Sequence, residues 1–217
     1  MSTITGFNPE QAKKDIENFK DYSYIHIESP LANTISNLLF SNLQNYWCSP
    51  KAVEFYKLYE PKCVNVLNEV TDTCKKIILN SWSAYNRLAT ANGLYSSYNN
   101  ELDDYRVPTN WQINCELKEE SPYGVVGMNK VQVRALINDV EEKIKTIIEA
   151  LDNAPSSIAF YDDGGELQSA FQNMIKTAGA HISELITEIT TALKTAMEEE
   201  IDKIELAKNS AVETMTA

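Results

Sequence analysis

Two histidines, His26 and His181, are the side chains in this sequence best suited to proton transfer near neutral pH. A catalytic or metal-binding histidine needs a Cys, Glu or second His at a spacing that brings both side chains to one face of a helix. We find no such ligand set around either histidine. We therefore expect both to be packing or surface residues.

Two acidic stretches, residues 162–165 and 198–200, have the composition of a cation site. The first resembles a fragment of a calcium-binding loop, but the alternating Asp or Asn ligands and the final Glu are missing. The second continues to Asp202 and Glu205, and carboxylates at successive helical positions point to different faces and do not converge on one ion. We expect the first stretch to cap a helix and the second to be a solvated face.

The four cysteines are Cys48, Cys63, Cys74 and Cys115, and none forms a Cys-x-x-Cys pair. Cys63 and Cys74 fall on an apolar helical stripe, where cysteine packs as a small hydrophobic residue. We expect neither a disulfide framework nor a zinc site. The sequence also lacks a phosphate-binding glycine loop, a nucleophile elbow and a Cys/His pair. These observations predict a protein that is not an enzyme and binds no cofactor or metal.

The longest regular pattern lies at residues 50–92, where apolar residues recur every three or four positions and form one stripe. Ser49 is placed to cap this helix, and Pro50 suits the first helical position, where a missing N–H is tolerated. Residues 8–46 predict a preceding helix. Because only a few residues connect the two, we expect them to run antiparallel as a hairpin.

Capping residues, a glycine and two prolines mark the predicted ends and interruptions of this hairpin. Asn8, with Gln11 three residues later, resembles a capping box at the start, and Gly93 is suited to end the second helix. Pro30 predicts a kink or a short restart in the first helix, and Pro61 predicts a kink in the second.

A helical hairpin with Trp47 in its turn and Phe55 eight residues later resembles the Trp-x-Gly family. Members of this family are small helical hairpins exported by type VII secretion systems and are often called early-secreted-antigen-like proteins. The resemblance covers roughly residues 8–92, and Ser49 stands where the family has glycine. It implies that Trp47, Ser49 and Phe55 form the turn and a surface that a secretion ATPase, an effector cargo or a second copy recognises. The alternative is that Trp47 only fills the end of a helical bundle.

The family's export tag is a Tyr-x-x-x-Asp/Glu sequence just beyond the second helix. At the matching place in this chain Tyr85 is followed by Ala89. Tyr24 with Glu28 and Tyr56 with Glu60 have the right spacing but lie inside predicted helices. The resemblance therefore implies a secretion-associated protein without showing how it would be exported.

The second half of the sequence repeats the layout of the first. Asn129 caps an amphipathic helix, and a second helix runs from about Leu167 toward the C-terminus. A shift of 116 residues places Phe55 on Phe171 in the same helical phase, which indicates a tandem duplication. We predict an all-α chain in which two long antiparallel hairpins pack as a four-helix bundle, with the turns beyond about Ile204 projecting or fraying. The predicted domains are 1–95 (first hairpin), 96–128 (linker) and 129–217 (second hairpin).

The linker is the least helical stretch of the sequence and contains a strand-like pattern. Residues 111–118 alternate strictly between apolar and polar, which is typical of a half-buried strand. With residues 123–126 as a return strand they predict a small β-hairpin docked on the bundle. The alternatives are an ordered linker between the two hairpins and an exposed edge that pairs with another protein.

The charge distribution limits the classes of partner. The formal charge is -12, and all of it lies in residues 101–217, where acidic residues outnumber basic ones by twenty-two to ten. Nucleic acid and anionic membrane surfaces are disfavoured because they require clustered Lys and Arg. Residues 1–7 do not read as a signal peptide, and we find no apolar run long enough to span a membrane. We expect synthesis in the cytoplasm and export by a route that does not depend on a signal peptide.

Three hypotheses follow. The first is a non-enzymatic type VII secretion-associated protein, either a secreted substrate or an adaptor or chaperone of one, acting as a monomeric pseudo-dimer or a homodimer. The second is a structural helical-bundle or coiled-coil interaction protein unrelated to secretion. The third is a membrane-active helical toxin, which the lack of a long apolar hairpin disfavours.

Overall fold

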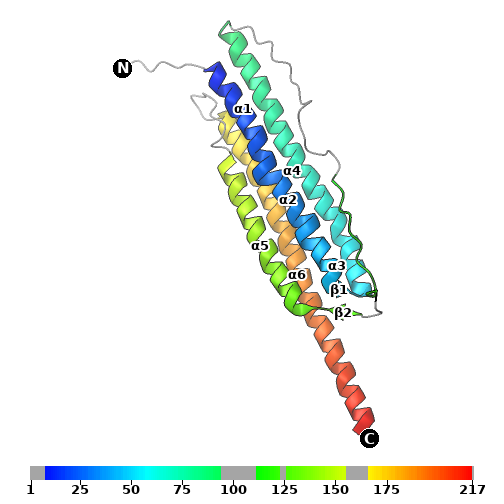
Figure 1. The fold of residues 1–217 in the computed structure, drawn as a ribbon. Helices are drawn as coiled ribbons and strands as arrows, with labels where there is room; N and C mark the ends of the chain where they lie inside the picture. The colour runs from blue at the N-terminus through cyan, green and yellow to red at the C-terminus, as the bar shows by residue number, and fades with distance from the viewer. Residues whose placement is uncertain (1–7, 94–110, 123–125, 155–165, 217) are drawn as a thin grey trace. The chain divides into compact units, whose positions relative to one another are not determined.

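A computed structural model describes residues 8–93, 111–122, 126–154 and 166–216, which are mostly helical with one two-stranded sheet (Figure 1). The expected all-α class is confirmed. In chain order, with η for a π-helix, the elements are α1 (Pro9–Ser23), η1 (Tyr24–Glu28), α2 (Ser29–Asn33), η2 (Thr34–Phe40), α3 (Ser41–Tyr46), β1 (Trp47–Cys48), α4 (Pro50–Ala91), β2 (Gly127–Met128), α5 (Lys130–Asn153) and α6 (Glu166–Thr216).

The backbone from α1 to α3 is helical without a break. Asn8 caps the start by accepting a hydrogen bond from Gln11 N at 3.1 Å, as its residue type predicts. The interruption expected at Pro30 takes the form of a π-helical turn: the N–H of Ser29 donates to the carbonyl of Tyr24, five residues earlier. A π-helical turn is wider than an α-helical turn, and this one comes just before Pro30, whose ring would otherwise clash with the preceding turn.

The predicted second helix is α4, and both of its ends have the expected chemistry. The helix continues through Pro61 as one element of 42 residues. Past Ala91 the chain reaches Gly93, whose φ of +71° is a left-handed conformation that few other residues adopt at low cost. Most of the predicted stripe is buried, including Cys63 and Cys74.

The helices of the second half also begin and end close to where the sequence predicts. Asn129 caps α5 by accepting a hydrogen bond from Gln132 N at 3.2 Å. The helix α6 is a single element of 51 residues. The acidic cap and the calcium-loop fragment predicted at residues 162–165 lie outside the described residues.

The chain divides into two compact units, each drawn from three separate stretches. Unit 1 comprises Met1–Ala32, Val64–Gln112 and Lys145–Ile182, and unit 2 comprises Asn33–Cys63, Ile113–Ile144 and Ser183–Ala217. Each unit therefore takes segments from both predicted hairpins. The domain boundaries inferred from the sequence remain a prediction.

Aromatic and apolar side chains join the helical segments of unit 1. The rings of Phe19 in α1 and Phe171 in α6 meet edge to face, with centroids 5.3 Å apart. Tyr22 Oη of α1 donates a hydrogen bond to the carbonyl of Ala150 in α5 at 2.9 Å. The ring contact and the hydrogen bond both join segments far apart in the sequence, so they define the packing of the unit.

Ion pairs accompany an apolar core in unit 2. Phe40 of η2 and Tyr56 of α4 pack edge to face at 5.3 Å between centroids. Lys62 of α4 pairs with Glu188 of α6. The pair is solvent-exposed and contributes little to stability compared with the buried apolar surface, but it fixes which residues of the two helices lie level with each other.

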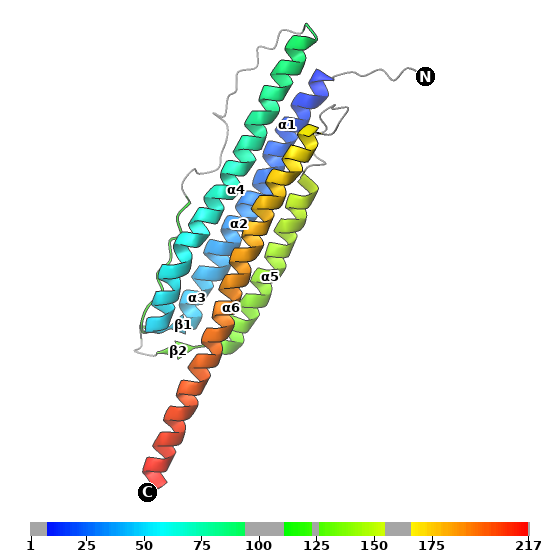
Figure 2. The same cartoon turned by 180° about the vertical axis from the view of Figure 1, so that it is seen from behind.

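The β-hairpin predicted for the linker is wrong for residues 111–118, which form no strand. They lie as an extended chain alongside α4 (green trace in Figures 1 and 2). The predicted alternation of burial is present, since Ile113 and Leu117 are buried while their neighbours are exposed. The buried side chains pack on helices instead of a partner strand. The sheet forms elsewhere, between β1 and β2 in antiparallel register.

Candidate functional site

The turn between α3 and α4 is built from three residues with distinct roles. Trp47 adopts an extended conformation, with φ -142° and ψ 115°, and so ends α3 at Tyr46. Ser49 Oγ accepts a hydrogen bond from Ala52 N at 3.1 Å and caps α4, as the sequence predicts. No described residue other than glycine has positive φ. The turn therefore closes without the glycine that the Trp-x-Gly pattern places at residue 49.

Two other parts of the chain hold this turn. In the sheet, Trp47 lies opposite Met128 and Cys48 lies opposite Gly127. The carbonyl of Tyr46 accepts a hydrogen bond from Asn129 N at 2.7 Å. The φ of Gly127, +151°, is one that L side chains rarely adopt, so glycine is required at this position.

A second backbone link runs to the extended segment. Ser49 N donates to the carbonyl of Lys118 at 3.0 Å, directly before the residues that continue toward β2. Residues 47–49 are consequently tied both to the stretch that ends at Pro122 and to the stretch that begins at Val126. The turn is fixed by main-chain hydrogen bonds to distant segments as well as by its own cap.

The three residues predicted as a recognition surface lie together, but inside the unit. Trp47 is 1% exposed, Ser49 3% and Phe55 7%. The indole of Trp47 packs on Phe55 with ring centroids 5.5 Å apart. All three residues therefore pack inside the unit. Their role in recognition remains a prediction, in which the exposed residues around the turn would contact the partner.

The indole N–H of Trp47 is buried without a hydrogen-bond partner among the described residues. A buried donor left unpaired costs stability, roughly 1–3 kcal/mol in typical proteins. The large apolar surface that the indole buries offsets this cost. Trp47 therefore contributes to the packing of the turn through the volume and shape of its indole.

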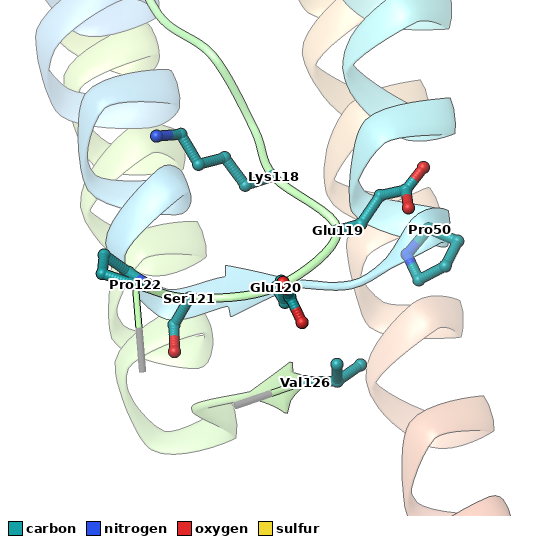
Figure 3. Close-up of a pocket in the computed structure, with 7 residues that line it drawn as sticks. All are labelled: Pro50, Lys118, Glu119, Glu120, Ser121, Pro122 and Val126. Atoms are coloured by element: carbon teal, nitrogen blue, oxygen red, sulfur yellow. The ribbon is translucent and has the colours of Figure 1, made fainter. Parts of the chain in front are cut away.

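A shallow hollow of about 750 Å³ lies beside the turn (Figure 3). Its lining consists of Pro50, Val126 and the loop that follows the extended segment, namely Lys118, Glu119, Glu120, Ser121 and Pro122. Figure 3 shows Pro50 and Pro122 on opposite sides of it, with Glu120 between them. Two carboxylates, one ammonium and several apolar surfaces suit protein contacts, and the lining holds no paired nucleophile and base.

The histidines do not lie in a shared site. His181 Nδ1 of α6 contacts Glu69 Oε1 of α4 at 2.6 Å, and both side chains are exposed. His26 is exposed, and its ring lies 4.7 Å from that of Tyr22. Among the described residues no group of three or more His, Cys, Asp or Glu side chains is arranged to hold a metal ion. Within the same residues no helix is long and apolar enough to cross a membrane.

The cysteines are free thiols, and burial sets their chemistry. Burial raises the pKa of Cys63 to about 12, with a smaller contribution from the charge of Glu60. Burial also raises the pKa of Cys74 well above its usual value, and the charge of Glu28 adds to this. A thiol with a raised pKa is a poor nucleophile because little thiolate forms.

Sequence reasoning missed the polar contacts that dock the extended segment. Trp111 Nε1 donates to Thr71 Oγ1 at 2.9 Å in unit 1. In unit 2, Tyr56 Oη donates to the carbonyl of Ile113 at 3.1 Å, and Cys115 Sγ lies 3.2 Å from the carbonyl of Phe40. The alternation of apolar residues indicated one buried face but carried no information on what buries it.

Sequence reasoning also missed a buried carboxyl group in unit 1. Glu28, at the end of η1, is 1% exposed and lies near Cys74, whose thiol it affects electrostatically. Ser23, fully buried, hydrogen-bonds to that thiol and donates to the carbonyl of Lys20 at 3.0 Å. A sequence pattern with an apolar residue every three or four positions does not show whether a Glu on the same helix is buried or exposed.

Comparison with known proteins gave no match to a family model, a curated protein or a solved structure. The resemblance to the Trp-x-Gly family therefore rests on Trp47, Phe55 and the helical hairpin predicted for residues 8–92.

Proposed function

We propose that this chain is a non-enzymatic protein associated with type VII secretion that acts by binding other proteins. It is either a secreted substrate or an adaptor or chaperone that accompanies one. The observation that carries the proposal is the turn itself: Trp47 ends one long helical run, Ser49 caps the next, and Phe55 packs on the indole. A helical hairpin built in this way is what the family resemblance implies.

The proposal includes the arrangement of the helices as two tandem hairpins in a four-helix bundle. Contacts within each unit support it. In unit 1, α1 touches both α5 and α6 through Tyr22 and Phe19. In unit 2, α6 pairs with α4 through Glu188 and with α5 through Lys194. A covalently joined pair of hairpins would cover in one chain the apolar faces that separate chains otherwise cover, which favours a monomeric pseudo-dimer over a homodimer.

Recognition in this proposal uses the surface around the turn. Trp47 sets the backbone position, and the exposed residues beside it make the contacts. Val126 and Val131, on either side of β2 in the sequence, are 57% and 78% exposed. Together with Glu119 and Glu120 they combine apolar and acidic surface close to one turn, a composition suited to a secretion ATPase or an effector cargo and unsuited to nucleic acid.

The experiment is an export assay in a host that carries a type VII apparatus. The tagged chain is produced in cells with and without the secretion ATPase, and its amount in the medium and in the cells is measured. We expect export that depends on the ATPase, or co-export of a bound cargo when the chain is an adaptor. Retention in both strains, with no effect on any exported protein, would contradict the proposal.

The alternative is a structural helical-bundle or coiled-coil interaction protein unrelated to secretion. The length of α6, 51 residues in one helix, favours it because an arm of this kind is typical of such proteins. The export assay separates the two functions, because only the first depends on the ATPase.

A further inference from the structure

The end of α4 carries an asparagine followed by a glycine. Asn92 comes directly after Ala91, the last residue of the helix, and Gly93 follows it. Asn92 is the only asparagine in the sequence that precedes a glycine. The side-chain amide of an asparagine is lost without an enzyme when the backbone nitrogen of the next residue attacks the side-chain carbonyl carbon. Glycine permits this attack most readily, because it has no Cβ to obstruct the approach.

The surroundings of this pair leave room for the attack. Asn92 and Gly93 are both exposed. A Cβ added at Gly93 would meet no atom within 4 Å, so nothing packs against its Cα. The φ of Gly93 is +71°, and glycine moves between positive and negative φ at little cost. The peptide group between the two residues is therefore open to water and to rotation.

Two hydrogen bonds hold the pair in an unreactive arrangement. Asn92 Nδ2 donates to the carbonyl of Leu88 at 2.8 Å, and Gly93 N donates to the carbonyl of Thr90 at 3.0 Å. Both bonds belong to the last turn of α4. Helix ends fray at a free-energy cost near zero, whereas the interior of a helix opens only with a larger part of the fold. Fraying of this one turn therefore releases both reacting groups.

We propose that Asn92 is a site of spontaneous deamidation and that the reaction loosens the end of α4. The Gly93 nitrogen loses its proton to solvent and bonds to Asn92 Cγ, the bond from Cγ to Nδ2 breaks, and ammonia leaves a cyclic imide. Water then opens the imide at either carbonyl and gives aspartate or isoaspartate. One water is consumed and one ammonia is released, with no oxidant or reductant. The reaction needs neither secretion nor a binding partner.

The product changes the electrostatics of the helix end. Aspartate at position 92 places a negative charge beside the C-terminal carbonyls, where the helix dipole is also negative. A carboxylate also cannot donate a hydrogen bond to the Leu88 carbonyl. We expect amide hydrogens in the last turn of α4 to exchange about threefold faster in Asn92→Asp than in the wild type. The uncharged Asn92→Gln should stay within about twofold of the wild type. Equal exchange in Asn92→Asp and the wild type would overturn the loosening of the helix.

The test of the reaction follows deamidation of the full chain in mildly alkaline buffer by mass spectrometry of its peptides. Asn80 provides the matched control, because it is exposed but lies inside α4. The variant Ser81→Gly creates a second Asn-Gly pair there, and circular dichroism checks that this variant is folded. In the folded variant we expect Asn92 to react at least about tenfold faster than Asn80. In concentrated guanidinium chloride the two rates should be similar.

Two results would overturn the proposed site. The first is a wild-type chain in which Asn92 stays unmodified under these conditions, a measurement that depends on no variant. The second is an equal rate at Asn92 and Asn80 in folded Ser81→Gly, because the sequence alone would then set the rate and the helix end would have no part in it. The export assay is independent of both results.

Discussion

The indole of Trp47 lies against the ring of Phe55, with centroids 5.5 Å apart and planes inclined by 56°. The two residues stand on either side of the Ser49 cap, and the ring of Tyr59, one turn further along α4, lies 4.6 Å from that of Phe55 between centroids. Aromatic pairs of this geometry add about 0.5–1.5 kcal/mol to the effect of burial alone. The turn is therefore a packed structural element in its own right, and its stability can be tested residue by residue.

Trp47→Ala should destabilise the protein by about 3–5 kcal/mol, because it leaves a large cavity where a side chain is 1% exposed. Trp47→Phe should cost less, about 1–2 kcal/mol, because it keeps an aromatic ring and removes the unpaired indole N–H. Urea denaturation followed by circular dichroism measures both. Trp82→Phe, at a half-buried tryptophan, is the matched control. Equal losses for Trp47→Phe and Trp47→Ala would contradict this account, because a phenyl ring would then recover none of the packing of the indole.

Ser49→Ala should cost about 1 kcal/mol, because the N–H of Ala52 loses its side-chain acceptor. Ser49→Gly, which restores the residue of the Trp-x-Gly pattern, should cost only a few tenths of a kcal/mol. Thermal unfolding of the two variants distinguishes these values. Ser210→Ala, at an exposed helical serine, should cause no loss. A neutral Ser49→Ala would mean that the backbone links to Lys118 and Asn129 hold the turn without the cap.

Cys63 and Cys74 should resist alkylation in the folded protein. Both are fully buried, and burial raises the pKa of each thiol, so little thiolate is present at about pH 8. Cys48 and Cys115 are only half-buried and should react first with iodoacetamide. Mass spectrometry of peptides from timed samples gives the order. In concentrated urea all four should react at similar rates, and rapid modification of Cys74 without urea would contradict its placement in the core.

The helix ends could be predicted because their causes are local. The caps at Asn8, Ser49 and Asn129 and the left-handed Gly93 depend on residues within one turn of the helix. The sheet could not be predicted, because strands of two residues such as Trp47–Cys48 are too short to show a pattern. Pairing of β1 with β2 depends on the fold as a whole.

The extended segment at residues 111–118 shows what an alternating sequence pattern can predict and what it cannot. Alternation at residues 111–118 predicted correctly that one side of the chain is buried and wrongly that a strand covers it. Burial of every second residue requires only an extended backbone against an apolar surface, and helices provide that surface as well as a sheet does. For Trp47 the sequence likewise left open whether the indole faces a partner or the core, and burial depends on contacts that only the fold supplies.

Tyr56 offers a test of how firmly the extended segment is docked in unit 2. Its Oη donates to the carbonyl of Ile113 at 3.1 Å, so Tyr56→Phe should cost about 1 kcal/mol at neutral pH. Burial, with smaller contributions from Glu60 and Cys115, raises the pKa of Tyr56 to about 12 from 10.0. The folded state therefore holds this proton at a pH where the unfolded chain releases it. The associated stability is complete below pH 10.0 and is lost as the pH rises toward about 12.

The difference in stability between wild type and Tyr56→Phe should consequently shrink as the pH rises from about 8 to about 11, because phenylalanine has no proton to lose. Urea unfolding at a series of pH values measures it. Tyr24→Phe, which removes a hydroxyl group from a tyrosine that is 42% exposed, is the control. Other buried groups, including Cys63, lower the stability of all three proteins alike at high pH and cancel in the comparison. A difference that stays constant over this range would mean that Tyr56 is solvated and that Ile113 is held by its apolar side chain alone.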